Sequence, residues 1–358
     1  IMNTDATAIR IKNSSLTIKD VAIETIEPLG SLSASTSAGI VVEDGSTLTL
    51  GQGVVVRNFE TGIHVKERSN LIQSSSTTNQ YQSVTSCGTG VLIDSNSQAT
   101  LQGFIVNGCW SDGFVVNNQS SGSFNSCIAV GNGSSGFLAT RNSNLVTVRC
   151  VSCYNIQDAA PTFNQNSEGG LGFGCRLNSN GEFSGCLSFR NGFGYFADKC
   201  SSVNVTSSDS TDCANRGVSV SEGSSAVIGP FFNSLADANG IYASDSSFVR
   251  SYDSNIEFAG FEAPTGIVGS AVVVVTNSTL NLQSSEIKNY GKNAVQAAFS
   301  SNIVGDNITI TENASSSGDS IHSTYNSAVR VLASDTGTGS NTTSSLLEGY
   351  IEVNGAEI

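Results

Sequence analysis

Three near-copies of one pattern follow one another between residues 90 and 143: Gly90-Val91-Leu92-Ile93, Gly113-Phe114-Val115-Val116 and Gly136-Phe137-Leu138-Ala139. The copies are 23 residues apart, and a serine follows each glycine by seven residues. Apolar side chains recur at every second position of each copy, which is typical of a strand with one buried face. A strand-based repeat of this length predicts a solenoid.

The glycine that opens each copy, here called the marker, continues outward in both directions. The markers are Gly39, Gly62, Gly90, Gly113, Gly136, Gly172, Gly194, Gly217 and Gly240, with Ala8, Ala271, Ala294 and Ser320 as weaker equivalents. An apolar residue follows every marker directly. Three short alternating segments fit into each repeat, as in residues 39–43, 46–50 and 54–56. The pattern therefore predicts an all-β parallel β-helix of about 13 coils.

Polar residues recur at two turns of the predicted coil. The residue seven past each marker is a serine: Ser15, Ser46, Ser69, Ser97, Ser120, Ser143, Ser179, Ser201, Ser224, Ser247, Ser278, Ser301 and Ser327. Asparagines share a second turn position: Asn58, Asn132, Asn155 and Asn191. We expect both columns to be structural ladders, in which side chains bond to neighbouring backbone or to one another. Cys127, Cys150 and Cys186 form a third column, interpreted as reduced packing residues.

The repeat leaves its register at a few places. The additional residues follow the third strand, near 27–35, 156–169 and 260–269, so they project from one edge, and that edge is often the binding face. We expect the β-helix to occupy residues 1–334 and a loop with a terminal strand to occupy 335–358. Because the strand pattern begins almost at Ile1, we interpret the sequence as a fragment of a longer chain.

Composition excludes several classes of function. The formal net charge is −14 with 16 Lys and Arg and no basic cluster, which argues against a nucleic-acid partner. No run approaches the roughly 18 apolar residues of a membrane span. Cys150 and Cys153 make the only Cys-x-x-Cys spacing, and no histidine lies near it, so we expect no metal site. Phosphate-loop and dinucleotide motifs are absent from the sequence, and we expect no cofactor.

Candidate chemistry rests on carboxylates. His64 and His322, the only histidines, fall at outward positions and are interpreted as solvated surface residues. Cleavage of a glycan needs two carboxyl groups at a fixed separation. The catalytic candidates near the expected edge are Asp212, Asp237, Asp158, Glu168 and Glu257, with Asp209 and Glu262 beside them. Asp212 and Asp237 occupy similar positions in adjacent coils. The alternative is that all are ordinary solvated acids.

Aromatic residues near the same edge are candidates for stacking on sugar rings. They are Trp110, Tyr154 and Phe258, with Phe163 and Phe261 nearby. Trp110 is the only tryptophan and falls at a turn between coils. Its amphipathic ring suits the apolar face of a sugar. The alternative is that the ring packs over an adjacent loop.

One outward column is apolar. It contains Val41, Leu92, Val115, Leu138, Phe196, Tyr242 and Val273, each two residues past a marker. An exposed apolar stripe of this kind favours self-association. Because coils stack in a line, a homotrimer of parallel chains would bury it. The alternative is that an insertion or a neighbouring domain covers the stripe.

The repeated coil of glycine, alternating apolar residues and serine resembles the right-handed, single-stranded parallel β-helix of bacteriophage tailspikes and of pectate-lyase-like carbohydrate enzymes. This resemblance implies a virion protein that binds, and in many cases cleaves, capsule or lipopolysaccharide of the host bacterium. The calcium-binding and Arg/Lys residues of pectate lyases have no counterparts that we can place. Two alternatives stay open: a secreted hydrolase, lyase or epimerase acting on glycans, and a purely structural shaft or adhesin segment.

Overall fold

The computed structural model describes residues 7–25, 37–73, 82–155, 170–235, 239–257, 269–288, 290, 292–311, 321–335, 343–346, 350–353 and 356–357. Two compact units make up the chain. Unit 1 comprises Ile1–Ala160 and Gly170–Glu182, and unit 2 comprises Pro161–Gly169 and Phe183–Ile358. Every element in the described ranges is a strand, and almost all pairings between strands are parallel. Strand β20 (Asn180–Ser184) contains the boundary between the units.

Unit 1 is built from coils of three strands each. The first strands of its coils pair in the order β1 (Ile9–Lys12), β4 (Ala38–Glu43), β7 (Thr61–Val65), β10 (Thr89–Ile93), β13 (Phe114–Val116), β16 (Phe137–Thr140) and β19 (Leu171–Arg176). We call this sheet A. The second strands are β2 (Ser15–Ile18), β5 (Thr47–Leu50), β8 (Asn70–Gln73), β11 (Gln98–Gln102), β14 (Ser121–Asn125) and β17 (Asn144–Val148). The third strands are β3 (Val21–Glu24), β6 (Val54–Arg57), β9 (Gln82–Thr85), β12 (Phe104–Asn107), β15 (Ile128–Val130) and β18 (Val151–Cys153).

Unit 2 repeats the same plan. Its sheet A strands are β22 (Phe193–Ala197), β25 (Arg216–Val220), β28 (Asn239–Ala243), β31 (Val272–Val275), β34 (Val295–Ala298), β36 (Ile321–Thr324) and β38 (Thr343–Leu346). Its second strands are β23 (Ser202–Thr206), β26 (Ser225–Ile228), β29 (Phe248–Tyr252), β32 (Thr279–Gln283), β35 (Asn302–Thr311), β37 (Ala328–Asp335) and β39 (Tyr350–Val353). Its third strands are β21 (Leu187–Phe189), β24 (Asp209–Thr211), β27 (Phe232–Leu235), β30 (Ser254–Glu257) and β33 (Glu286–Lys288). A last strand, β40 (Ala356–Glu357), pairs antiparallel with β39.

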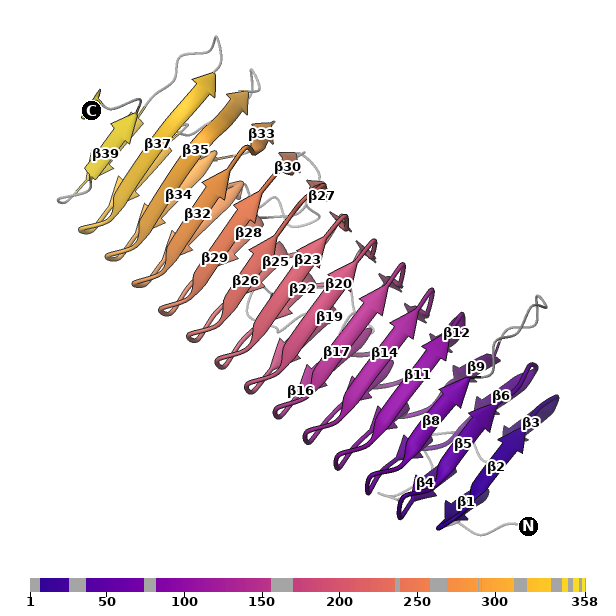
Figure 1. The fold of residues 1–358 in the computed structure, drawn as a ribbon. Coiled ribbons are helices and arrows are strands. Elements are labelled where there is room, and N and C mark those ends of the chain that lie inside the picture. Colours follow the sequence, from indigo (N-terminus) through magenta and orange to yellow (C-terminus); the bar gives the residue numbers. More distant parts are fainter. Residues whose placement is uncertain are drawn as a thin grey trace. The chain divides into compact units, whose positions relative to one another are not determined.

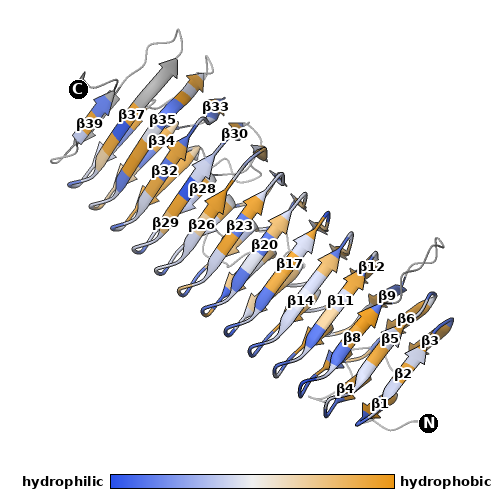
Figure 2. Cartoon of the chain, viewed as in Figure 1, coloured by the Kyte–Doolittle hydropathy of each residue, from blue (hydrophilic) through white to orange (hydrophobic). Residues whose placement is uncertain are grey.

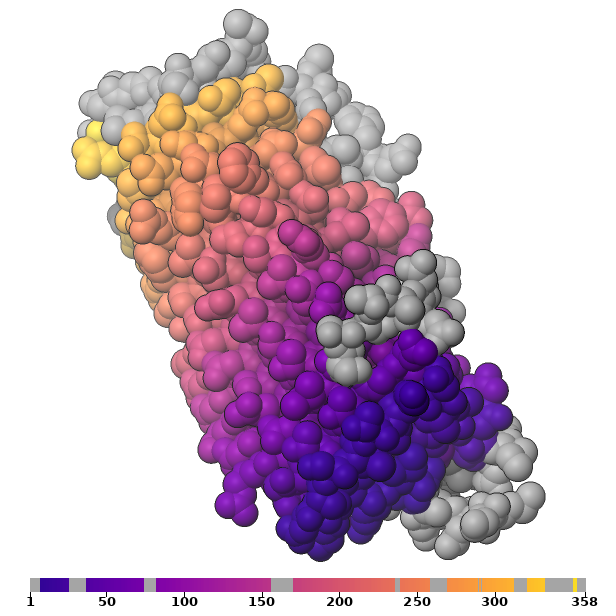
Figure 3. Space-filling model, turned by 45° about the vertical axis from the view of Figure 1, so that its right-hand side comes forward, coloured from indigo at the N-terminus to yellow at the C-terminus, as the bar shows by residue number. Residues whose placement is uncertain are grey.

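The register between coils confirms the 23-residue repeat. Val91 pairs with Phe114, and Phe114 with Phe137, each one repeat further along the chain. Successive coils of unit 1 lie side by side, as β2, β5, β8 and β11 show in Figure 1. In the space-filling view the colour changes gradually from indigo to purple over these coils (Figure 3). All thirteen expected first strands are present and β38 adds one, so the predicted parallel β-helix is confirmed.

The parallel pairing extends past residue 334. Strand β38 pairs in register with β36, and β39 pairs in register with β37. Residues 343–353, which we expected to belong to a separate loop and terminal strand, therefore contain two strands with the same neighbours as the other coils.

The interior of each unit is a column of apolar side chains next to the markers. In unit 1, the Phe114 and Phe137 rings stack with centroids 4.7 Å apart, and those of Phe137 and Phe173 are 5.0 Å apart. These rings are fully buried. Residues facing away from the interior are mixed in polarity, and Figure 2 shows both kinds along the strands. Alternation of the side chains along each strand places one set inside the coil.

At the glycine markers, the third strand of the same coil and a carbonyl group of the next coil come too close for a side chain. A Cβ atom on Gly90 would lie 2.3 Å from a Val106 methyl carbon and 2.5 Å from the Gly113 carbonyl oxygen. Both distances are far inside van der Waals contact. The glycine column therefore follows from packing inside the coil and not from backbone torsion.

The serine column forms the predicted ladder. The backbone N–H of each serine donates to the hydroxyl of the serine in the next coil, at 3.1 Å for Ser46 to Ser69 and 3.3 Å for Ser120 to Ser143. Ser15 was assigned wrongly. Ser14 is the residue whose N–H reaches the Ser46 hydroxyl, because the first coil has one residue fewer at this turn.

Two consecutive residues with positive φ precede the serines at this turn. Ser95 and Asn96 have φ values of 55° and 62°, and Arg141 and Asn142 have values of 54° and 62°. Asparagine and glycine tolerate this backbone region better than other residues. Their frequent occurrence directly before the serine explains the dipeptide Asn-Ser that recurs along the sequence.

The asparagine ladder is confirmed only in part. Asn132 donates from its side-chain amide and its backbone to the Asn155 oxygen, at 2.9 and 3.0 Å. Asn191, in unit 2, donates to Ser188 at 2.8 Å. Asn58 was assigned wrongly, because the residue that follows it, Phe59, is buried at this corner of the coil.

Most cysteines are buried in the interior. Cys87, Cys109, Cys127, Cys150, Cys175, Cys186 and Cys213 are buried, Cys153 is half-buried and Cys200 is exposed. The Cys127 N–H contacts the Cys150 sulfur at 3.4 Å, which confirms that these two share a column. Burial raises the pKa of the Cys87 thiol to about 11 and that of Cys109 to about 12. Their environment is therefore that of small packing residues.

Candidate functional site

Four of the predicted site residues lie outside the described residues: Asp158, Glu168, Asp237 and Phe258. The expected insertions near 27–35 and 156–169 lie outside them as well, as does all of the expected insertion 260–269 except residue 269. The structure therefore places Asp212, Glu257, Trp110 and Tyr154. Each of these can be compared with its expected role.

Asp212 forms a surface ion pair. It lies at the turn after β24, and its carboxylate accepts from the Arg190 guanidinium of the preceding coil at 3.4 Å. Glu257 ends β30, two coils beyond Asp212, where it is half-buried and in register with Lys288. Asp212 is thus engaged with a cation and not with a second carboxylate among the described residues. The alternative of solvated acids fits this arrangement.

Trp110 projects from a turn of unit 1. Its side chain is 64% exposed, while its backbone N–H donates to the Cys87 carbonyl at 2.8 Å. The corresponding residues of the adjacent coils are Gly88 and Gly133. A Cβ on Gly133 would lie 2.0 Å from the Trp110 carbonyl oxygen, so no side chain fits there. The indole ring consequently stands beside bare backbone on both sides.

Tyr154 lies at the turn after β18, also in unit 1. Its side chain is 45% exposed and its φ is 55°. Positive φ is uncommon for an aromatic residue and costs conformational energy. The register puts Tyr154 two coils beyond Trp110, roughly 10 Å along the stack at the usual strand spacing.

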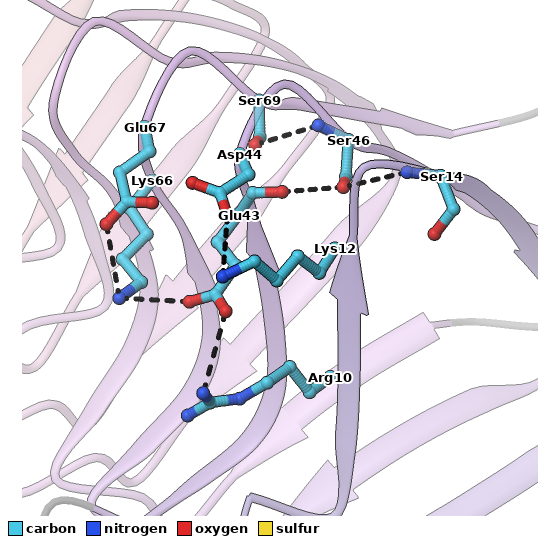
Figure 4. Close-up of polar contacts among 9 residues, drawn as sticks. All are labelled: Arg10, Lys12, Ser14, Glu43, Asp44, Ser46, Lys66, Glu67 and Ser69. Atoms are coloured by element: carbon cyan, nitrogen blue, oxygen red, sulfur yellow. Dashed lines mark hydrogen bonds and ion pairs between the residues drawn. The ribbon is translucent and has the colours of Figure 1, made fainter.

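A cluster of six charged side chains occupies the outer face of unit 1 at its first coils. We call it the charge cluster, and its members are Arg10, Lys12, Glu43, Asp44, Lys66 and Glu67 (Figure 4). Glu43 is at its centre: its carboxylate lies 3.5 Å from Arg10 and 3.1 Å from Lys66, and its side chain is only 6% exposed. Lys66 also reaches Glu67 at 3.5 Å, and Lys12 reaches Asp44 at 2.8 Å. Three acids and three bases balance one another.

The register explains why these charges meet. Lys12, Glu43, Lys66 and Asp94 each lie four residues past a marker and occupy one column of adjacent coils. Their charges alternate in sign along that column. Each side chain therefore faces opposite charges one strand spacing away. This cluster was not predicted, although charges alternate in sign at a fixed position of the repeat in the sequence.

The electrostatics of the cluster follow from these contacts. The hydrogen bond from Lys12 holds the pKa of the Asp44 carboxyl below its usual range, and the same bond raises the pKa of Lys12. Both groups are open to solvent, so the pair contributes little to stability. Glu43 differs because it is buried, and its carboxylate depends on Arg10 and Lys66 for compensation.

His64 lies between Val41 and Leu92 on the same outer face. It is half-buried, and its Nε2 atom has no hydrogen-bond partner among the described residues. Burial lowers the pKa of His64, with smaller opposing effects of Asp94 and Glu43. The interpretation of His64 as a solvated surface histidine was wrong, because neighbouring apolar side chains cover it. His322, in unit 2, is half-buried too.

The apolar column is less exposed than predicted. Val41, Val115 and Val273 are only 4%, 8% and 8% exposed within the single chain. Leu92, Leu138, Phe196 and Tyr242 are half-buried. His64 interrupts the column in unit 1 and Ser219 interrupts it in unit 2. A continuous exposed stripe is therefore not present.

The described residues contain neither a candidate metal site nor a candidate membrane-spanning helix. No three His, Cys, Asp or Glu side chains in those ranges come together in a way that could hold a metal ion. Nor do the same ranges contain a helix long and apolar enough to cross a membrane.

Comparison with known proteins gives a family and three similar structures. Residues 7–155 and 89–260 match the family described as "Right handed beta helix region". The catalytic unit of a thermostable GH87 α-1,3-glucanase from Streptomyces thermodiastaticus strain HF3-3 is 13% identical, with a TM-score of 0.43 over 95% of this chain and 62% of that one. The A-modules of the mannuronan C-5 epimerases AlgE6 and AlgE4 from Azotobacter vinelandii are 11% and 14% identical. Both have TM-scores of 0.38 over 95% of this chain, and cover 90% and 86% of the modules. Curated protein sequences contain no match.

Proposed function

The chain belongs to the right-handed β-helix family, and from that premise we propose that it recognises a bacterial surface polysaccharide as part of a phage tailspike or tail fibre. The expected target is capsule or lipopolysaccharide, and the expected location is the virion tail, with an extracellular location as the alternative. This proposal concerns recognition first. Cleavage of the bound glycan would be a separate activity.

The observation that carries the proposal is the exposed indole of Trp110. Its backbone is fixed by the coil, so little conformational entropy is lost when a ligand packs on the ring. Glycines occupy the corresponding positions of both adjacent coils, so no side chain at those positions covers the indole, which is 64% exposed. Sugar rings have apolar faces, and a large exposed aromatic is well suited to them.

Assembly as a homotrimer is part of the same proposal. The half-buried Leu92 and Leu138 supply apolar area on the outer face of sheet A in unit 1. Light scattering tests this directly: a trimer would have about three times the 37.0 kDa mass of the chain. A strictly monomeric protein would remove the trimer from the proposal.

Recognition is tested by fluorescence, because Trp110 is the only tryptophan and reports on itself alone. We expect capsular polysaccharide or lipopolysaccharide of the host to shift or quench this emission. Trp110→Ala has no tryptophan, so its affinity is measured by titration calorimetry, where we expect binding to weaken by about tenfold or more. Phe231→Ser is the matched control, since Phe231 is 72% exposed but lies in unit 2. It should bind as the parent protein does.

Two outcomes would contradict the proposal. Binding that does not change the Trp110 emission of the parent protein, together with an unchanged affinity in Trp110→Ala, would place the site elsewhere. Failure to bind any surface glycan of bacteria to which the virion attaches would favour the purely structural shaft or adhesin segment.

A second candidate is a secreted carbohydrate-active enzyme, and the two partly exposed members of the charge cluster, Lys66 and Glu67, favour it. The Lys66 ammonium, a proton donor, lies 3.5 Å from the carboxylate of Glu67, a proton acceptor, and these side chains are 29% and 46% exposed on an outer sheet face. Release of reducing ends or of unsaturated uronate from a panel of polysaccharides would support catalysis. Lys66→Met should then abolish the reaction, while Arg57→Met, which removes a cation paired with Glu24 outside the cluster, should not.

A further inference from the structure

A second group of side chains stands on the outer face of sheet A, in unit 2. Phe193 and Phe196 come from β22, Arg216 from β25 and Tyr242 from β28, three adjacent strands labelled in Figure 1. We call this group the arginine–aromatic cluster. All four side chains are half-buried, so they remain accessible from solvent.

The rings hold the Arg216 guanidinium. Its central carbon lies 3.3 Å from the centroid of the Tyr242 ring and 5.7 Å from that of Phe193. Phe193 in turn contacts Phe196, with centroids 5.4 Å apart. Aromatic faces attract a guanidinium through their quadrupole and fix its plane. The cation is thus oriented before any ligand arrives.

Arg216 has no carboxylate partner among the described residues. Its Nη1 donates to the Ser219 hydroxyl at 3.0 Å, and Tyr242 is a second side-chain hydrogen-bond partner, which leaves other N–H donors of the five available. Asp245 of the neighbouring coil attracts it without forming an ion pair, and burial lowers the pKa of Arg216. Two other arginines of unit 2 do have such partners: Arg190 pairs with Asp212, and Arg330 with Glu352 at 3.0 Å.

An oriented, uncompensated guanidinium is suited to a planar anion. The free N–H groups at its edge match the two oxygens of a carboxylate, which can bind in a bidentate manner. The adjoining Phe196 and Tyr242 rings provide apolar surface for the ring that carries the carboxylate. A sugar acid combines both features in one residue.

We propose that the arginine–aromatic cluster binds an anionic sugar residue, with the carboxylate of a uronic acid on Arg216 and the sugar ring against the aromatic side chains. This inference rests on the proposed function and narrows its ligand to acidic polysaccharides. It also separates this cluster from Trp110, whose contact with a sugar needs no charge.

The test uses monosaccharide probes, so that it does not depend on knowing the natural glycan. Protein labelled with 15N and 13C in its arginines gives a resolved Nε–Hε signal for Arg216, assigned by its loss in Arg216→Lys. We expect methyl glucuronide to shift this signal with a dissociation constant on the order of millimolar. Methyl glucoside should bind about tenfold more weakly or not at all, because the carboxylate carries the recognition. The Arg190 signal serves as the internal control and should not move.

Several outcomes decide the inference. Loss of methyl glucuronide binding in Arg216→Lys, with an unchanged unfolding transition, supports the inference. Lysine keeps the positive charge but lacks the paired N–H donors that bind a carboxylate in a bidentate manner. Equal responses to glucuronide and glucoside, or none to either, would overturn it while leaving polysaccharide binding at Trp110 intact. A shift of the Arg216 signal with glucose 6-sulfate but not with methyl glucuronide would show that the cluster binds a sulfate group and not a carboxylate. This outcome would contradict the proposed uronic acid ligand. A change in oligomer mass on Arg216→Met would identify the face as an interface between copies instead.

Discussion

The outer faces of sheet A in the two units carry charge in opposite ways. In unit 1 the charge cluster balances three cations with three anions, and the buried Glu43 contacts both Arg10 and Lys66. In unit 2 the Arg216 guanidinium is held by aromatic rings and one hydroxyl, with no carboxylate at ion-pair distance among the described residues. Both faces have the same backbone plan, so the difference lies in the side chains.

This difference shows on which face the charged groups are already paired within the protein. A carboxylate that is buried between two cations stabilises the coils from which those cations come, and its removal leaves uncompensated charge. A guanidinium that only rings compensate retains unused donors. The first arrangement serves the fold, whereas the second has capacity for an external anion. The predictions below test this division.

The largest effect is expected from Glu43→Gln. Its amide would leave Arg10 and Lys66 without their shared anion, and we expect the free energy of unfolding to fall by about 1–3 kcal/mol. This is less than for a fully buried pair, because the Arg10 side chain is 60% exposed. Arg216→Met should cost less than about 1 kcal/mol, since the aromatic rings can pack on its apolar chain. Urea unfolding measures both. Equal losses in the two variants would contradict the division.

A smaller effect is expected from the pH dependence of His64. Because burial lowers its pKa, the unfolded chain binds more protons than the folded one below the usual pKa of about 6.5. The stability of unit 1 should therefore fall as the pH decreases from 6.5 toward the folded pKa and level off below it. His64→Gln should flatten this part of the profile. The urea midpoint of unfolding is measured as a function of pH for the parent protein and for His64→Gln. If both proteins show the same slope between neutral and mildly acidic pH, His64 is not the group that causes the pH dependence.

The pair Lys12 and Asp44 should give a weaker acid dependence. Since the pKa of Asp44 is lowered in the folded protein, its contribution is present above the unfolded value of about 4 and disappears as the pH falls through the folded value. Lys12→Met should reduce stability slightly at pH 6 and converge with the parent at lower pH. Arg216→Met, which has no carboxylate partner to lose, should show a pH-independent difference in the same range. A constant difference for Lys12→Met would refute the assignment.

The smallest effect concerns thiols, for which we expect differences in reactivity without a change in stability. Cys200 is exposed at a turn of unit 2, whereas burial raises the pKa of Cys87 and Cys109 in unit 1. A thiol reagent should modify Cys200 rapidly in the folded protein, and Cys200→Ser should remove this fast phase. The buried thiols should react only after denaturation. Rapid modification of Cys87 or Cys109 at neutral pH would contradict the tight packing of the interior.

The candidate site shows where sequence reasoning succeeded and where it did not. Trp110 was placed correctly at a turn because its position in the repeat is unambiguous. Asp212 was read as a possible partner for another acid, but it pairs with Arg190, which a search restricted to carboxylates could not reveal. Asn58 and Ser15 were misplaced by one residue each. A turn that gains or loses one residue moves the side chain to another column without altering the strands.

The sequence by itself determined the coil, because a 23-residue spacing of glycines, apolar residues and serines permits only one way of stacking the strands. It also contained the alternating charges of Lys12, Glu43, Lys66 and Asp94, once the register is known. Only the tertiary structure decided which charges are compensated. The Arg216 side chain contacts the ring of Tyr242, which lies three residues past its register partner Asn239 in the next coil. His64 is half-buried between Val41 and Leu92. Burial and side-chain direction depend on packing between coils, which no position in the repeat specifies.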